Sequence, residues 1–381
     1  MNSRILKLAA AAGLGIIFAW GCRNMETELL EPELYFESLE NVIDIGEDAT
    51  MTFELESRLS SSVSSDVQVT YTIENDQSYV DEYNKRFGRE YPLFTGAALE
   101  SDASSVPAGE IYSDAVNLSL SGLDAVQEGE NYVIPIRVRT GDVPVISGSD
   151  MTYVIVRRLP KITTVARFNN SFFKIPISPL NVFNEVTYEA IVNVSSFGNN
   201  NTVMGCEGVM IMRIGDAGGG TVPRDILQMA GKSEITWTDN PLEAGKWYHL
   251  AFTCNSAGEA CLYVNGENVI KSTFTMSQDL TANGADYGFS VGMVPGFKWG
   301  TRPFYGYMSE VRLWDVVRTA NQIKENMLVV NPSTPGLVAY YRLNGDLNDS
   351  SPNGYNPTDF TAPSFETIDV PIAIGGGLTE E

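Results

Sequence analysis

Short β-rich runs recur along almost the whole chain, and this pattern constrains the fold most. Several of them, including residues 67–73 and 132–139, alternate apolar and polar side chains. Such alternation is typical of half-buried antiparallel strands. Turns rich in Ser, Gly, Asp and Pro separate the runs, as in β-sandwiches. The chain is therefore predicted to be all-β.

The runs fall into two blocks on either side of Pro160, which cannot donate to a strand ladder and reads as a linker. Residues 35–158 are predicted to form a small Ig-like β-sandwich. Within this block Tyr79, Tyr83 and Phe87 are spaced i, i+4, i+8, which predicts one short amphipathic helix over 78–87.

The second block, residues 162–370, has the size and strand content of a jelly roll, and 371–381 is expected to be a tail. One short helix is predicted there, from Thr319 as the N-cap to Met327.

The N-terminus has the pattern of a targeting signal. Arg4 and Lys7 precede an uncharged, mostly apolar run of 13 residues at 8–20. That run is shorter than the ~20 residues of a bilayer span but suits a signal sequence. It ends at Ala19-Trp20-Gly21-Cys22, which resembles a bacterial lipobox. Residues 1–21 are thus predicted to be a lipoprotein signal peptide with Cys22 lipidated. The alternative is an ordinary secretory signal.

Residues 22–34 are acidic and are predicted to form a solvated tether. An acidic segment after the lipidated cysteine resembles the surface-export signal of Bacteroides-type lipoproteins. The resemblance implies an outer-membrane protein that faces the cell exterior and touches the membrane only through its lipid.

Charge excludes several functions. Lys and Arg number 25 against 48 Asp and Glu, a formal net charge of −23. That balance argues against nucleic-acid binding and against a basic membrane-binding face. His249 is the single histidine, which excludes multi-histidine metal sites. It lies between Tyr248 and Leu250 in a predicted strand, where packing is favoured over catalysis.

Residues 247–254 and 261–266 read as a β-hairpin around a Ser/Ala/Gly turn. With the tip centred on Ala257-Gly258, Cys254 and Cys261 would face each other, and a cross-strand disulfide is expected. The alternative is two buried free thiols. Cys206 is expected to be an unpaired core residue.

Three ordered motifs resemble laminin-G-like, concanavalin A-like domains. Residues 246–268 are similar to their central hairpin, 303–319 to their F-x-G-x-[IM]-x-E-V-R-[LIV]-[WY] strand, and 337–354 to their closing segment. The second block is therefore expected to be a concanavalin A-like jelly-roll β-sandwich.

The first block resembles an N-terminal domain of unknown function from Bacteroides polysaccharide-utilisation lipoproteins, on residues 79–85, 106–113 and 131–136. Together the resemblances imply a carbohydrate-associated surface lipoprotein. Its implied partners are an oligo- or polysaccharide, an outer-membrane glycan importer and surface glycosidases.

Some members of the concanavalin A-like superfamily are glycosidases with a Glu-x-Asp-x-Glu strand, and that string is absent from the sequence. Glu185 and Glu189 share a strand face but would lie ~13 Å apart, beyond the ~5–9.5 Å of glycosidase carboxylate pairs. Glu310 and Asp315 should point to opposite faces. The chain is predicted not to be an enzyme, although a carboxylate pair across strands stays open.

Sugar binding needs aromatic platforms together with polar groups. The Gly- and Pro-containing stretch 295–305 is predicted to be a loop that supplies them. Trp237 is a second candidate platform, and one loop aromatic could instead tuck under the loop. The run 199–201 could bind hydroxyls or form a solvated turn. The candidate ligand-binding residues are Trp299, Phe297, Lys298, Arg302, Tyr305 and Trp237.

Calcium is the one cofactor considered, since many laminin-G-like domains bind it. Asp346, Asn348 and Asp349 offer oxygen ligands but do not fit EF-hand spacing. The alternative is that Asp349 caps the turn that follows it.

The predicted function is capture of a polysaccharide or host glycan at the cell surface. The alternatives are a glycoside hydrolase of the same fold and a protein-docking scaffold. The first block is expected to be a spacer.

Overall fold

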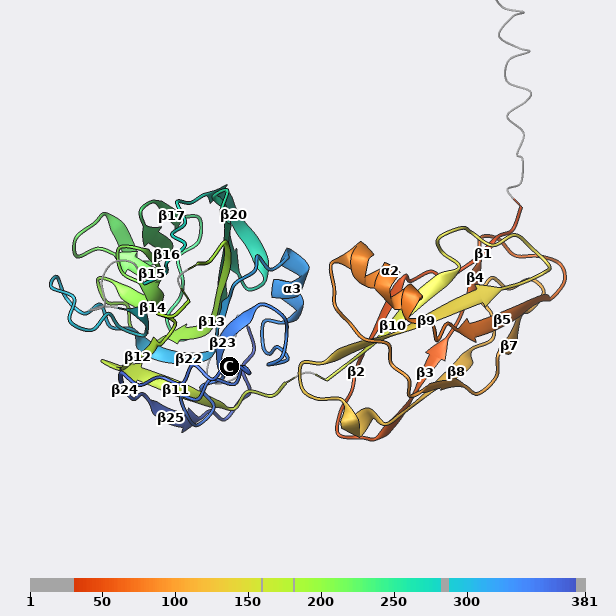
Figure 1. The fold of residues 1–381 in the computed structure, drawn as a ribbon. Helices are drawn as coiled ribbons and strands as arrows, with labels where there is room; N and C mark the ends of the chain where they lie inside the picture. Colours follow the sequence, from red (N-terminus) through yellow and green to blue (C-terminus); the bar gives the residue numbers. More distant parts are fainter. Residues whose placement is uncertain (1–30, 159, 181, 282–287, 375–381) are drawn as a thin grey trace, which may run out of the picture.

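A computed structural model describes residues 31–158, 160–180, 182–281 and 288–374 (Figure 1). The predicted signal peptide, Cys22 and most of the predicted tail lie outside these ranges. Strands from 34 to 157 form an N-terminal domain, and strands from 164 to 367 form a C-terminal domain. The all-β prediction is confirmed. In the described ranges neither helix has the length and apolar character that a bilayer crossing requires.

The N-terminal domain is a sandwich of a five-stranded and a three-stranded sheet, as far as the structure describes it. The larger sheet has the order β2-β10-β9-β5-β7, with β2 parallel to β10, and the smaller has the order β3-β8-β6. Apolar residues from both sheets form one core, and β1 pairs with β4 at its edge. The strands are β1 (Leu34–Tyr35), β2 (Glu40–Asp44), β3 (Thr50–Leu55), β4 (Arg58–Leu59), β5 (Val67–Ile73), β6 (Ala97–Leu99), β7 (Ala103–Val106), β8 (Val116–Ser121), β9 (Asn131–Arg139) and β10 (Met151–Arg157).

Helix α2 (Gln77–Phe87) confirms the predicted helix of this domain. The Asp76 carboxylate caps its start by accepting from the Ser78 N–H, and Gly88 ends it with φ +65°. Val80 and Tyr83 pack against the face of the larger sheet that is opposite the sandwich core. The apolar stripe read from the sequence is therefore the stripe that attaches the helix.

The C-terminal domain pairs two larger sheets around a second core. In the described residues one sheet runs β20-β19-β18-β13-β22-β11-β25, with β23 also paired to β22. The facing sheet runs β17-β16-β15-β14-β21-β12-β24. The strands are β11 (Thr164–Asn169), β12 (Phe172–Ile175), β13 (Glu185–Val194), β14 (Asn201–Cys206), β15 (Met210–Asp216), β16 (Val222–Gly231), β17 (Glu234–Trp237), β18 (Trp247–Asn255), β19 (Glu259–Val264), β20 (Glu267–Thr273), β21 (Phe289–Val291), β22 (Tyr305–Trp314), β23 (Leu337–Tyr341), β24 (Phe360–Thr361) and β25 (Ser364–Thr367).

Helix α3 (Ala320–Glu325) follows β22 and begins, as predicted, at the N-cap Thr319. The Thr319 hydroxyl accepts from the Gln322 N–H, while the Gln322 side chain accepts from the Thr319 N–H. This reciprocal capping fixes the start of the helix. Ile323 is buried against Ala251 and Tyr263, so α3 lies on the outer face of the β18–β19 hairpin.

The predicted disulfide is wrong. The hairpin pairs Cys254 with Ala260 and Thr253 with Cys261, so the register differs by one residue from the predicted pairing of Cys254 with Cys261. Successive strand residues point to opposite faces, and a shift of one residue therefore separates the two thiols. Cys254 is buried in the core and Cys261 is partly exposed, and neither they nor buried Cys206 form a disulfide.

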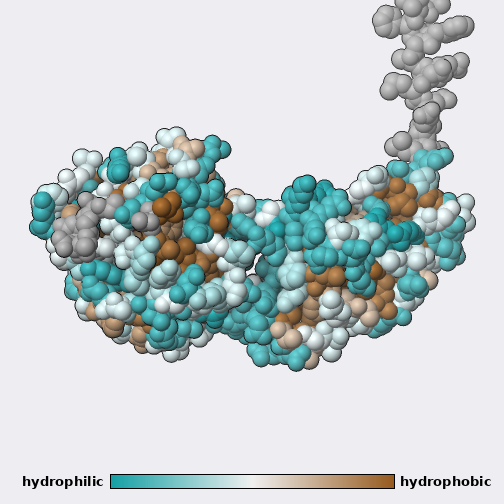
Figure 2. Space-filling model, viewed as in Figure 1, coloured by the Kyte–Doolittle hydropathy of each residue, from teal (hydrophilic) through white to brown (hydrophobic). Residues whose placement is uncertain are grey.

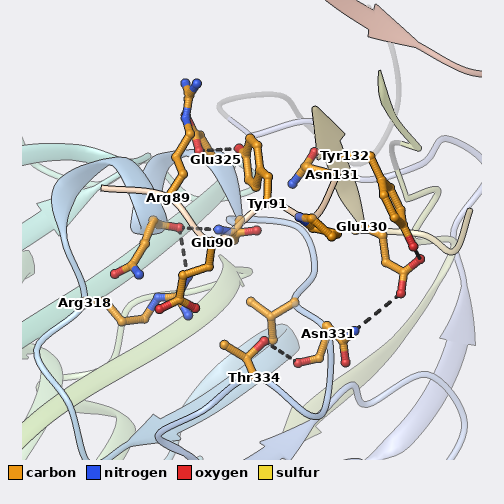
Figure 3. Close-up of a pocket in the computed structure, with 15 residues that line it drawn as sticks. Arg89, Glu90, Tyr91, Glu130, Asn131, Tyr132, Arg318, Glu325, Asn331 and Thr334 are labelled. Atoms are coloured by element: carbon orange, nitrogen blue, oxygen red, sulfur yellow. Dashed lines mark hydrogen bonds and ion pairs between the residues drawn. The ribbon is translucent and has the colours of Figure 1, made fainter. Parts of the chain in front are cut away.

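The two domains meet through charged side chains. The Arg89 Nε–H donates to Glu325 Oε1 over 2.7 Å, and the same guanidinium also bonds Glu40. Tyr91 donates its hydroxyl hydrogen to the other Glu325 oxygen. Figure 3 shows Arg89 and Tyr91 beside Glu325. Arg89 thus links the Glu40 carboxylate of its own domain to the Glu325 carboxylate of helix α3.

Further contacts surround this ion pair. The Asn321 side-chain amide donates to the Phe87 carbonyl over 2.7 Å, and Asn331 donates to Glu130 over 3.4 Å. A cavity of about 140 Å³ remains between the two domains at this point (Figure 3). On the face drawn in Figure 2 the strip between the domains is mostly hydrophilic, which agrees with these polar contacts.

Candidate carbohydrate-binding site

The loop between β21 and β22 lies on the outer face of the seven-stranded sheet. Ile211 and Ala230 are register partners on β15 and β16, and they pack with Val294 and Phe297 in a small cluster outside the main core. Phe297 is 8% exposed. The alternative that one aromatic tucks under the loop is thus confirmed for Phe297, which anchors the loop instead of offering a platform.

Trp299 stands out from this anchored loop with 75% of its surface exposed. Its ring meets Phe297 edge-on, with ring centroids 5.5 Å apart and an angle of 87°. The exposed Lys298 places Nζ 4.1 Å from the centroid of the Trp299 ring. An exposed indole on a fixed support is a flat apolar surface held in one place.

Arg302 fixes the far end of the loop. It has φ +54°, and its carbonyl accepts from the Thr202 N–H on β14 over 3.1 Å. The guanidinium lies 4.4 Å from the Phe297 ring centroid and forms an ion pair with Glu207. Arg302 is therefore a structural member of the loop as well as part of its surface.

An open cleft of about 880 Å³ lies beside this loop. Three of the predicted residues, Trp299, Arg302 and Tyr305, line one side of it. Asn199 and Asn200, from the turn that enters β14, line the other side with Asp216 and the glycines of the following turn. The 199–201 run thus contributes two amides to the cleft. Asp216 was missed because a single acidic residue at a strand end carries no distinctive sequence signal.

A network of polar groups supports the cleft wall. Arg213 on β15 donates to Asp216 over 2.8 Å and to Gln228 on β16 over 2.8 Å. Burial lowers the pKa of Arg213, although the Asp216 charge acts against that shift. The Asn200 amide nitrogen donates to the other Asp216 oxygen over 3.2 Å. Asp216 is thereby held by a guanidinium and an amide.

This bond to Asp216 orients the Asn200 amide. Because a carboxylate only accepts, the amide nitrogen must face Asp216 and Oδ1 must point the other way. Oδ1 is buried and has no hydrogen-bond partner in the described part of the chain. A buried acceptor without a donor is costly.

Trp237 does not join this site. It is 7% exposed and belongs to the core between the two sheets. On β17 the side chains alternate, so that Ile235 and Trp237 face the core while Thr236 accepts from Gln228 on the outer face. The prediction of a second platform at Trp237 is therefore wrong, because its ring packs in the core.

The predicted calcium ligands form a hydrogen-bonded turn. The carboxylate of Asp349 accepts from the N–H groups of Tyr340, Ser351 and Tyr355, and Asp346 accepts from Asn348. The capping role of Asp349 is confirmed. Across the described ranges no cluster of three His, Cys, Asp or Glu side chains could hold a metal ion. Calcium binding stays a prediction.

His249 lies on the other sheet in a closed cluster of charges. Its Nε2 is 3.1 Å from Glu189 Oε2, and both side chains are fully buried. Arg312 donates to the same Glu189 oxygen over 3.0 Å and to Glu310 over 2.8 Å. Burial works to raise the pKa of Glu189, but Arg318, His249 and Arg312 outweigh it and lower the pKa to about 2. The packed interpretation of His249 is confirmed.

Each of the two domains matches a model of a known protein family. Residues 168–324 match the model of the concanavalin A-like lectin/glucanases superfamily, and residues 30–145 match a model of an N-terminal domain. None of the curated proteins matches the chain.

Two solved structures of low sequence identity also match parts of the chain. Domain 4 of AbnA, an extracellular arabinanase of Geobacillus stearothermophilus solved with arabinotriose, is 13% identical over 70% of this chain and 98% of its own, with a TM-score of 0.30. EndoBT-3987 of Bacteroides thetaiotamicron, solved with a Man5GlcNAc product, is 16% identical over 39% of this chain and 36% of its own, with a TM-score of 0.29. At these scores neither supports an argument about function.

A candidate carbohydrate-binding protein of Bacteroides ovatus is much more similar. It is 41% identical, over 90% of this chain and 99% of its own length, with a TM-score of 0.61. The chain belongs to the same family as this Bacteroides ovatus protein, in which a β-rich N-terminal domain precedes a concanavalin A-like domain.

Proposed function

We propose that this chain is a surface lipoprotein that binds a glycan in the cleft beside Trp299. The observation that carries the proposal is the indole of Trp299, which is 75% exposed on a loop anchored by Phe297. The carbohydrate-binding candidate from Bacteroides ovatus, at 41% identity, supports the same ligand class.

The chemistry of the cleft suits a sugar. A pyranose presents apolar C–H groups on its faces, which stack on an indole, and hydroxyls on its edges, which need hydrogen-bond partners. Asn199, Asn200, Asp216 and Tyr305 line the cleft together with Trp299. The cleft is wide and open, a shape that admits the interior of a chain as well as its end.

Binding is proposed in preference to cleavage. Glycosidases act with two carboxyl groups about 5–9.5 Å apart on either side of the scissile bond. Among the described residues that line the cleft, Asp216 is the one carboxylate, and Arg213 and Asn200 both bond it. Glu189 and Glu310 are buried on the other sheet and bonded to Arg312.

The cellular location of the protein is also part of the proposal. The lipobox-like residues 19–22 and the acidic stretch after them support an outer-membrane lipid anchor that faces the exterior. The N-terminal domain would then serve as a spacer between lipid and cleft. A glycan importer and surface glycosidases are the proposed partners.

The test is binding of the full chain to neutral and acidic plant and mucosal polysaccharides, measured by affinity electrophoresis and calorimetry with Ca²⁺ or a chelator. Trp299→Ala should weaken binding by about tenfold or more, since one stacking contact is removed. The matched control is Phe360→Ala, a second exposed aromatic of the same domain, 49% exposed and outside the cleft-lining residues.

The outcomes separate the candidate functions. Binding without new chromatographic products, weakened by Trp299→Ala and not by Phe360→Ala, supports glycan capture. Release of oligosaccharides would replace the proposal with hydrolysis. No binding to any polysaccharide would contradict it and favour a protein-docking role.

A further inference from the structure

Two arginines at the cleft are already paired. Arg302, which lines the cleft, forms an ion pair with Glu207, and both side chains are less than one-fifth exposed. Arg213, behind the wall, pairs with Asp216 over 2.8 Å. These two guanidinium groups and two carboxylates cancel one another, so neither arginine offers a ligand an unbalanced positive charge.

An acidic sugar would therefore have to share an arginine that a carboxylate already neutralises. A uronate or sulfate that bonded Arg302 would place a second negative charge beside Glu207. Placing like charges together at a partly buried site is costly. The net charge of −23 acts in the same direction on any polyanionic chain that approaches.

The carboxylate that lines the cleft is also the wrong partner for an anion. Asp216 lines the cleft, and its side chain is 20% exposed. A sugar hydroxyl can donate to a carboxylate, whereas a uronate or sulfate brings only acceptors and a second negative charge. The lining of the cleft thus matches alcohol hydroxyls.

We propose that the Trp299 cleft selects neutral saccharides and discriminates against uronate- and sulfate-bearing ones, a specificity that rests on the glycan binding proposed above. Lys298 carries the positive charge that could bind an acidic ligand and so contradict this specificity. It is exposed, and its Nζ contacts the Trp299 ring, with no ion pair to it found in the described ranges. An acidic ligand would need Lys298, whereas a neutral ligand would not.

The test uses the full chain against xylan, mannan, arabinan and dextran as neutral probes and polygalacturonate, alginate and chondroitin sulfate as acidic probes. The neutral probe that binds best is then oxidised to its uronate form, and any acidic probe that binds is carboxyl-reduced. The two polysaccharides of each pair share one sugar backbone and differ in charge.

The expected result is at least about tenfold weaker binding of the charged member of a pair, in the unmodified chain and in Lys298→Gln alike. Preferred binding of the charged member or equal binding of both would overturn the specificity while leaving glycan binding intact. Failure of every probe to bind would instead contradict the proposed function, and the specificity with it.

Discussion

At the scale of single residues, the charged side chains buried around His249 join neighbouring strands of the C-terminal domain. His249 contacts Glu189, and Glu189 also faces Arg312 and Arg318. Burial lowers the pKa of His249, and the nearby Glu189 only partly offsets that effect. The cluster therefore combines a neutral imidazole with a carboxylate held charged by two arginines, an arrangement that joins β13, β18 and β22 and has no opening to the cleft.

This arrangement predicts a pH effect on stability. The folded-state pKa of His249 lies below its ordinary value of 6.5, so the unfolded chain binds more protons in the interval between the two values. The free energy of unfolding should fall as the pH drops below about 6.5, by at most about 1.4 kcal/mol per pH unit from this group. His249→Gln, which keeps a donor for Glu189, should remove that component.

Denaturant unfolding of the unmodified protein and of His249→Gln between about pH 7.5 and 5 measures the contribution of His249. The difference between the two stability curves isolates His249 from the other titrating groups. A difference that stays constant over this interval would contradict the prediction.

Two tryptophans show which residue-level features the sequence could predict. Trp299 lies among Gly and Pro, a composition that predicts a surface loop but not which of its aromatic rings is exposed. Trp237 lies in a β-strand, where the sequence shows alternation but not which set of residues faces inward. That depends on which face of the sheet packs against the facing sheet, whose strands are distant in sequence. The Asp216 contribution was likewise missed because it depends on two turns distant in sequence.

At the scale of elements, the β18–β19 hairpin shows how local pattern can give the element and miss its register. Both strands and their turn were predicted, but the register differs by one residue. Helix positions were predicted more closely, since Thr319 and the Tyr79-Tyr83-Phe87 spacing are local signals. Sheet order was beyond the sequence pattern, because neighbours such as β13 and β22 are over a hundred residues apart.

The observed register predicts that the two cysteines behave differently. Burial raises the pKa of the Cys254 thiol to about 11, so it should react with alkylating reagent only after unfolding. Cys254→Ser should cost about 1–3 kcal/mol by placing a hydroxyl in the core, whereas Cys261→Ser should cost less than about 1 kcal/mol. Unfolding titrations give these values. Peptide mass analysis without reductant showing a bridge between Cys254 and Cys261 would contradict the register.

At the scale of the whole molecule, the contact between domains determines where the cleft sits relative to the N-terminal domain. Besides the Arg89–Glu325 pair, Gly129 of the N-terminal domain lies directly against Val329 of the C-terminal domain. A Cβ at position 129 would come 2.1 Å from Val329 Cγ1, far inside contact distance. The two domains are therefore in close steric contact, which the sequence alone could not show because it joins segments two hundred residues apart.

Gly129→Ala should change how the domains are arranged, and Gly148→Ala is its matched control. Both glycines have φ +80°, so an alanine at either position should cost about 1 kcal/mol through backbone strain. A Cβ at 148 meets nothing within 4 Å, whereas one at 129 must displace Val329. Small-angle X-ray scattering should then show a changed distance distribution for Gly129→Ala alone, with faster proteolysis around residues 158–162. Identical scattering from the two variants would mean that the domains do not hold this contact in solution, and that the N-terminal domain is a flexible spacer instead of a fixed one.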